Sequence, residues 1–118
     1  VVIFNNGALG FIELEQKSSG FVDFGTGFAN PDFAAMANAC GIKGIRIEDP
    51  ADLEQAIAEA LAHPGPVVID AVVERMEMAM PPKVTGEMAK GFTLYMLKAV
   101  LSGRGDEVIE LAKANLLR

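Results

Sequence analysis

Apolar residues along the chain follow two patterns, short unbroken runs and longer stretches with helical spacing. Val1–Phe4 and Val67–Val73 are rich in β-branched residues and predict strands buried on both faces. Gly44–Ile47 predicts a third, shorter strand. Asp70 interrupts the last run, either as a functional carboxylate or because an alternating strand has a partly polar edge, and the pattern favours the edge.

The stretches between these runs have the start and stop signals of helices. Leu9 and Ile12 are the next apolar positions after the first strand and predict a helix, with Glu13 and Glu15 expected on its solvent-exposed face. Asn30-Pro31 and Asp49-Pro50 each place a capping residue before proline, which predicts helix starts at both points. The order strand, helix, helix, strand, helix, strand predicts an α/β fold, part of a doubly wound parallel sheet.

The last third of the chain predicts a helical tail after a connector that contains Pro81-Pro82. A strongly apolar helix over 92–101 is followed by a glycine-rich break and an amphipathic helix whose apolar side carries Val108, Ile109, Leu111 and Leu116. Burying these four side chains releases roughly 6–12 kcal/mol gross, so this face needs a partner. The sheet domain, another subunit and a membrane all remain open, and the mixed charges of the polar face favour protein.

Length and charge set the class of protein. The 118 residues suffice for one domain or part of one, and a net charge of −6 argues against a nucleic-acid binder. No run reaches the ~18 apolar residues of a membrane span, and we expect a cytosolic protein. Because a buried parallel strand at Val1 needs neighbours, we expect the chain to be the carboxyl-terminal piece of a longer protein.

The turn Asn5-Asn6-Gly7, which ends the first strand, is the first candidate for chemistry. Ligands of open parallel sheets bind at this end of the strands, and a following helix offers N–H groups to a phosphate. Asparagine and backbone oxygens are ligands that suit Mg²⁺. The same three residues also form an ordinary turn, and the spacing alone favours that interpretation.

Four segments carry a resemblance to a known family. Asn5-Asn6 resembles the end of the thiamin diphosphate motif that opens with Gly-Asp-Gly, and Asn6–Ile12 is similar to the cofactor-binding turn of pyruvate oxidases. Ala89–Lys98 and Ser102–Lys113 resemble the tail of the quinone-linked bacterial enzymes. The likeness runs from Val1 to Arg118, and the chain is identified as similar to pyruvate dehydrogenase (quinone), also called pyruvate oxidase.

The resemblance implies a set of site residues. It gives Mg²⁺ the side-chain oxygen of Asn6 and the backbone carbonyl of Ala8. It places the thiamin diphosphate against seven consecutive residues: Asn6, Gly7, Ala8, Leu9, Gly10, Phe11 and Ile12. It also implies a catalytic role for Phe11, an aromatic that moves into the active site and assists electron transfer to flavin. From the residues alone, Phe11 is instead a helix residue that packs on the sheet.

The resemblance also implies an activity and a setting for it. Pyruvate is oxidatively decarboxylated to acetate and CO₂ with thiamin diphosphate, Mg²⁺ and FAD, and the electrons pass to a membrane quinone. Residues 1–76 form part of the cofactor-binding domain, and 77–118 form a connector and an amphipathic membrane-binding region whose last helix contacts lipid. The protein is expected to be a homo-oligomer, a tetramer in the family, cytoplasmic and peripheral on the cytoplasmic face of the membrane when activated. The flavin site, the Gly-Asp-Gly carboxylate and a catalytic glutamate are expected outside these residues, so the chain alone should be inactive.

Three alternatives remain open. Asn30–Phe33 and Gly41–Ile45 also suit an acetolactate synthase, against which the tail argues. A pyruvate oxidase that reduces oxygen needs no membrane-docking helix. A third alternative, from another class, is a scaffold without catalysis whose amphipathic tail binds lipid or a partner protein.

Overall fold

The computed structural model describes residues 1–77 and 83–116, which form two compact units. The first unit contains residues 1–7 and 29–73, and the second contains residues 8–28 and 74–118. The connector predicted around Pro81-Pro82 lies outside the described residues. The boundary predicted between residues 76 and 77 stays a prediction.

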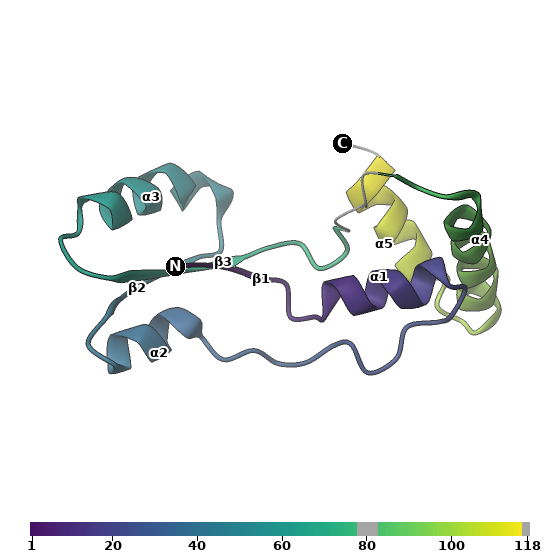
Figure 1. Cartoon of the computed structure of the whole chain (residues 1–118), viewed down its shortest axis with the longest axis horizontal. Coiled ribbons are helices and arrows are strands. Elements are labelled where there is room, and N and C mark those ends of the chain that lie inside the picture. Colours follow the sequence, from purple (N-terminus) through teal and green to yellow (C-terminus); the bar gives the residue numbers. More distant parts are fainter. Residues whose placement is uncertain (78–82, 117–118) are drawn as a thin grey trace. The chain divides into compact units, whose positions relative to one another are not determined.

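The first unit is an α/β layer structure, and the predicted fold class is confirmed (Figure 1). Its strands are β1 (Val2–Asn5), β2 (Lys43–Ile47) and β3 (Val67–Val72), which form a parallel sheet in the order β1-β3-β2. The helices α2 (Phe33–Ala39) and α3 (Leu53–Ala62) lie on opposite faces of this sheet (Figure 1). The predicted order of elements is therefore correct.

Local capping explains where the helices of this unit begin and end. Asp49 caps a 3₁₀ turn over Pro50–Asp52 that leads into α3, as the sequence predicts. The predicted cap of α2 is wrong, because Asp32 caps that helix by accepting a hydrogen bond from the Ala35 N–H at 2.7 Å. Gly41 ends α2 with φ 75°, a left-handed conformation that favours glycine.

The core of the first unit lies between α3 and the sheet. It consists of Ile47, Ala56 and Ile69, with Ile45, Ala60 and Val67 packed against them. On the opposite face α2 approaches β2 so closely that a Cβ on Gly44 would lie 2.0 Å from the Ala34 carbonyl oxygen. Only glycine fits this position, so the sequence of β2 sets the distance between helix and sheet.

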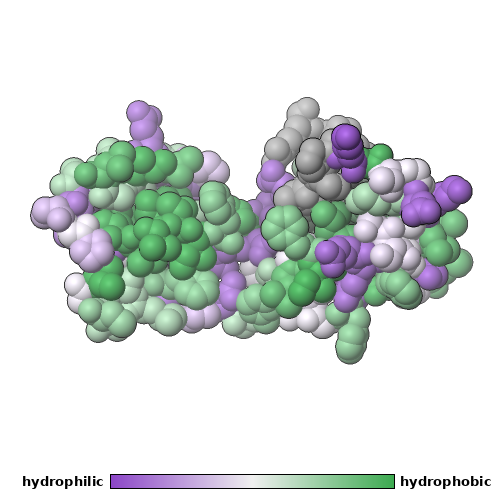
Figure 2. Space-filling model, viewed as in Figure 1, coloured by the Kyte–Doolittle hydropathy of each residue, from purple (hydrophilic) through white to green (hydrophobic). Residues whose placement is uncertain are grey.

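Burial of β1 differs from the prediction. The sequence predicts a strand buried on both faces, yet Val2 is exposed and Phe4 exposes 76% of its surface. The reason is that α2 and α3 pack on β2 and β3, whereas β1 lies at the far edge of the sheet, paired with β3 through Val2 opposite Ile69 and Phe4 opposite Ala71. Together with exposed Leu61 of α3, these residues leave the first unit rich in surface hydrophobic side chains (Figure 2).

The second unit is helical. It consists of α1 (Gly10–Ser18), an irregular loop, α4 (Gly86–Leu101) and α5 (Gly105–Leu116). Its core contains Tyr95, Ala99 and Leu111, with Met76, Phe92 and Val108 packed against them. The apolar side predicted for the last helix is thus partly covered by protein within the unit. No helix of residues 1–77 and 83–116 combines the length and apolar character needed to cross a membrane.

The orientation of α1 is the reverse of the prediction at two positions. Glu13, expected on the wet face, is buried together with Leu14 and Lys17, whereas Ile12 is exposed. The carboxylate of Glu13 is buried because Lys17 forms an ion pair with it and Thr26 donates a hydrogen bond to it at 3.1 Å. An ion pair within the helix and a hydrogen bond from the following loop therefore outweigh hydrophobic periodicity here.

Candidate functional site

A buried carboxylate lies beneath the turn that ends β1. Asp70 is fully buried and accepts hydrogen bonds from the Asn5 side-chain amide at 3.0 Å, the Phe33 N–H at 3.1 Å and the Arg46 guanidinium at 2.7 Å. Asn30 completes the group by donating to the Asn5 side-chain oxygen at 2.7 Å. We call Asn5, Asn30, Arg46 and Asp70 the Asp70 cluster.

The Asp70 cluster corrects the sequence interpretation of Asp70. The partly polar edge is wrong, because β3 is the central strand of the sheet and Asp70 has no exposed surface. A buried carboxylate is stable only when it is paired and hydrogen-bonded, and the cluster provides both kinds of contact. An acidic residue within an apolar strand was the available signal, but its partners are 24 to 65 residues away in the sequence.

Arg46 balances the charge of Asp70 at the surface side of the cluster. Its guanidinium also donates to the Glu48 carboxylate at 2.7 Å. The hydrogen bond with Glu48, followed by the charges of Asp70 and Glu48, raises the pKa of Arg46 further above its ordinary value despite partial desolvation. Arg46 therefore stays cationic, and the Asp70–Arg46 pair adds no net charge beneath the turn.

Asn5 has both ends of its side-chain amide occupied. The oxygen accepts from Asn30, the nitrogen donates to Asp70, and the backbone carbonyl accepts from the Val73 N–H at 3.0 Å. Asn6 is the next residue, lies just beyond the end of β1 and is half-buried. The side-chain amide of Asn5 is thus used within the fold, and the binding role of Asn6 stays a prediction.

Gly7 follows with φ 64°, in the left-handed region. A residue with a side chain rarely adopts this conformation, so glycine lets the chain turn sharply after Asn6. Asn6 and Gly7 belong to the first unit, and Ala8 is the first residue of the second unit.

In the second unit, the loop over residues 20–28 is hydrogen-bonded to the residues that precede α1. Ala8 forms an antiparallel bridge with Gly27, and the Leu9 N–H donates to the Thr26 carbonyl at 2.8 Å. Leu9 is the N-cap residue of α1 and has no side-chain acceptor to offer the first turn. The N–H groups at Gly10, Phe11 and Ile12 are thus not capped by this residue, as expected where a helix receives an anion.

Phe11 and its neighbours are exposed. Phe11 exposes 73% of its surface, and Leu9 and Ile12 are also exposed. The alternative that Phe11 packs on the sheet stays a prediction, because the sheet belongs to the first unit and Phe11 to the second. The predicted catalytic role of Phe11 and the cofactor contacts of Gly7, Gly10 and Ile12 stay predictions.

Buried charges attach the loop over residues 20–28 to the tail helices. Asp23 accepts from the Arg104 guanidinium at 3.0 Å and lies 3.7 Å from the Lys17 ammonium group. Burial acts to raise the pKa of Asp23, but the hydrogen bond with Arg104 and the two positive charges outweigh it, so the pKa lies below its usual value. Asp23 is therefore ionised at neutral pH and connects the turn between α4 and α5 to the loop that holds Leu9.

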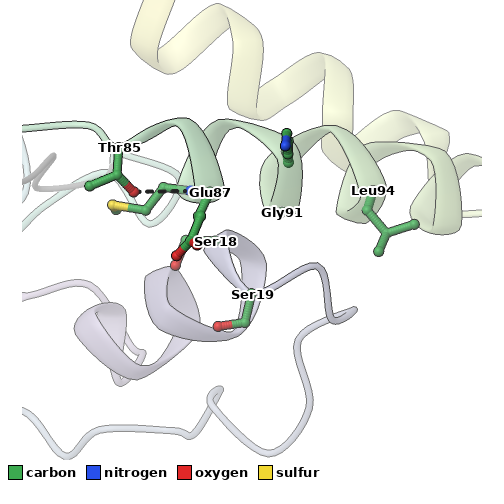
Figure 3. A pocket seen from close by; sticks show the side chains of 8 residues that line it. Ser18, Ser19, Thr85, Glu87, Gly91 and Leu94 are labelled. Carbon is green, nitrogen blue, oxygen red and sulfur yellow. Dashed lines mark hydrogen bonds between the residues drawn. The ribbon is translucent and has the colours of Figure 1, made fainter.

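A shallow cavity of about 440 Å³ lies in the second unit between the end of α1 and the start of α4 (Figure 3). Ser18, Ser19 and Glu87 line it, and Thr85 caps α4 by accepting from the Met88 N–H at 3.2 Å. None of the predicted site residues lines this cavity.

The donor set of the predicted metal site is neutral. Among residues 1–77 and 83–116, no three His, Cys, Asp or Glu side chains gather where they could hold a metal ion. The predicted ligands are of a different kind, one amide oxygen from Asn6 and one backbone carbonyl from Ala8. Mg²⁺ binds such oxygens when a phosphate and a carboxylate complete its shell, so these residues fit the metal in type.

Comparison with known proteins gives the family of the chain. The family described as "Thiamine pyrophosphate enzyme, C-terminal TPP binding domain" matches residues 1–71. The chain is 42% identical over 114 residues to "Putative thiamine pyrophosphate-containing protein YdaP" of Bacillus subtilis, which covers 97% of this chain and 20% of that protein. It is 33% identical over 92 residues to the acetolactate synthase large subunit of Cyanidium caldarium, covering 74% of this chain and 15% of that protein. The chain thus spans about a fifth or less of the length of these relatives.

Proposed function

The chain belongs to the family of thiamine pyrophosphate enzymes, with residues 1–71 in its C-terminal cofactor-binding domain, and from this premise we propose that it supplies the magnesium-binding turn of an enzyme acting on pyruvate. The observation that carries the proposal is the fixed turn at the end of β1. Asn5 is held inside the fold at both ends of its amide, while Asn6 and Gly7 follow at the carboxyl end of the strand.

The residues of the turn have distinct roles in this proposal. Asn6 and Ala8 give Mg²⁺ a side-chain oxygen and a backbone oxygen. Gly7 to Ile12 would contact the diphosphate, because the first turn of a helix offers N–H groups and a positive dipole end that suit a negative charge. When bound, thiamin diphosphate supplies the carbanion-stabilising chemistry by which a 2-oxo acid loses CO₂.

The first candidate activity is that of an acetolactate synthase. Several relatives carry this name, and they match between 44% and 74% of this chain, for example the proteins from Cyanidium caldarium and Saccharomyces cerevisiae. This candidate explains the cofactor domain but leaves the tail after residue 71 without an assigned role.

The second candidate is oxidation of pyruvate to acetate and CO₂ with FAD and a membrane quinone. Two observations favour it: the resemblance of 89–113 to the tail of quinone-linked enzymes, and the exposed apolar residues of α4. Leu94, Leu97 and Leu101 follow one another at helical spacing and are all exposed. In this case the tail attaches the protein to the cytoplasmic face of the membrane, and Phe11 assists electron transfer to the flavin.

Calorimetric titration of the intact protein with thiamin diphosphate tests the cofactor site. We expect binding with Mg²⁺ present, a large loss when EDTA removes the metal, and at least a tenfold weaker affinity for Mg²⁺ in Asn6→Ala. Asn38→Ala is the matched control, because Asn38 lies on α2, is exposed, and forms hydrogen bonds with the backbone of Gly44 through its side chain. Binding that is equal with and without Mg²⁺, or unchanged in Asn6→Ala, would refute the proposed site.

Product analysis with pyruvate separates the two activities. Acetolactate without an added electron acceptor supports the first candidate. Acetate formed only with a quinone, together with pyruvate-dependent co-sedimentation with liposomes, supports the second. Acetate formed with oxygen and without lipid supports an oxygen-linked oxidase. If none of these assays yields a product, the proposed activity on pyruvate is refuted.

A further inference from the structure

We infer that Asp70 and Asn30 are positioning residues for the metal site, because they fix the side chain of Asn5 and through it the backbone that presents Asn6. This inference rests on the proposed function and names residues that lie outside the turn itself. Neither residue needs to contact the metal or the cofactor for the effect.

The first step of the argument is that Asn5 cannot rotate without loss. Its amide nitrogen donates to Asp70 at 3.0 Å, and its amide oxygen accepts from Asn30 at 2.7 Å. Rotation of the amide by 180° would place two donors against each other at Asn30 and two acceptors against each other at Asp70. Since Asn5 is buried, water does not replace the lost partners.

The second step connects Asn5 to Asn6 through the backbone. The Asn5 carbonyl accepts from Val73 N–H at 3.0 Å, and this carbonyl belongs to the peptide plane that leads into Asn6. Side chain and backbone of Asn5 are therefore held on β3 and on the segment before α2. With the peptide plane fixed, only the torsion angles of Asn6 itself remain to orient its side chain.

The third step concerns the rigidity of Asp70. Its second carboxylate oxygen accepts from the Phe33 N–H at the start of α2 and from Arg46 on β2. The Asp70 cluster thus joins β1, β2, β3 and the start of α2 at a single buried carboxylate. A ligand held this way loses less conformational freedom on binding a metal, which is how outer residues raise metal affinity.

Asn30→Ala in the intact protein is the direct test. Asn30 lies in a loop and is half-buried, so its loss removes one hydrogen bond to Asn5 without opening the core. Asn38→Ala is again the matched control, as another asparagine of the first unit whose side chain binds Gly44 at 2.9 Å. The readout is the Mg²⁺ affinity measured by calorimetry at saturating thiamin diphosphate, with Mn²⁺ electron paramagnetic resonance as a spectroscopic check.

We expect Mg²⁺ to bind about threefold to tenfold more weakly to Asn30→Ala, as the loss of one hydrogen bond to a positioned ligand predicts. The Mn²⁺ spectrum should broaden in this variant and stay unchanged in Asn38→Ala. If wild-type protein binds Mg²⁺ and both variants bind it equally well, the inference is wrong and the proposed function stands. If wild-type protein shows no Mg²⁺-dependent cofactor binding, both are wrong.

Discussion

Replacement of Gly91 by alanine tests the packing of the tail on α1. Gly91 lies in the middle of α4, and a Cβ at this position would be 1.7 Å from the Ser18 carbonyl oxygen and 2.5 Å from the Ser18 carbonyl carbon. Figure 3 shows Gly91 and Ser18 in this part of the second unit. The clashing atoms belong to the backbone of α1, which cannot rotate away as a side chain would.

The expected magnitude follows from two opposing terms. Alanine in place of glycine within a helix stabilises the helix by about 1 kcal/mol. The clash requires the two backbones to separate by roughly 1.5–2 Å to restore normal contact distances, and overpacking of this kind costs about 3 kcal/mol. The net expectation is a loss of about 2 kcal/mol, which corresponds to a roughly 30-fold larger equilibrium population of the open contact.

Hydrogen exchange measured by mass spectrometry is the suitable assay, because it reports local opening in a protein with more than one unit. We expect faster exchange in peptides from α1 and α4 of Gly91→Ala. Gly86→Ala is the control, since a Cβ on Gly86 in the first turn of the same helix meets no atom within 4 Å. If Gly91→Ala exchanges as slowly as Gly86→Ala, the close approach of α4 to α1 does not exist in the protein.

Two further predictions concern the buried polar groups of the second unit. The pKa of Asp23 is lowered from 3.8. The stability that its ionised form contributes is therefore present above about pH 4 and is lost as the pH falls through the lower, folded-state pKa. The free energy of unfolding, measured by denaturation between pH 6 and pH 3, should show this loss, and Asp23→Asn should be less stable at pH 6 with a flatter dependence of stability on pH. A profile in Asp23→Asn as steep as that of the wild type would contradict this assignment. Tyr95 is fully buried, its hydroxyl has no hydrogen-bond partner among the described residues, and burial raises its pKa, so the hydroxyl stays protonated. Tyr95→Phe should therefore be as stable as the wild type or more stable by up to about 1 kcal/mol in chemical denaturation, and a clear destabilisation would show that the hydroxyl has a partner in solution.

The Asp70 cluster gives the turn of the cofactor site a rigid foundation within the first unit. Two neutral asparagines at the end of a strand are a common turn, and nothing in their local sequence separates the roles of Asn5 and Asn6. The tertiary contacts give Asn5 a structural role, because its side-chain amide is hydrogen-bonded to Asp70 and Asn30. The role of Asn6 as the metal ligand stays a prediction.

The sequence by itself determined the elements of the first unit and their order. Strands at Val1–Phe4, Gly44–Ile47 and Val67–Val73 match β1, β2 and β3 within one or two residues. Asp49-Pro50 also marks a helix start correctly. These features depend on residues within a few positions of each other, where hydrophobic spacing, proline and glycine restrict the backbone directly.

Only the tertiary structure decided which polar residues are buried and what they hold. Glu13 lies inside because Thr26, from the loop after α1, adds a hydrogen bond to the ion pair with Lys17 of the same helix, and the partners of Asp70 come from other strands of the sheet. Asn30 does not cap α2. Its side chain binds Asn5, which lies 25 residues away in the sequence. The physical reason is that a buried charge or amide is stabilised by whichever groups the fold brings within about 3 Å, and no local pattern in the sequence records those groups.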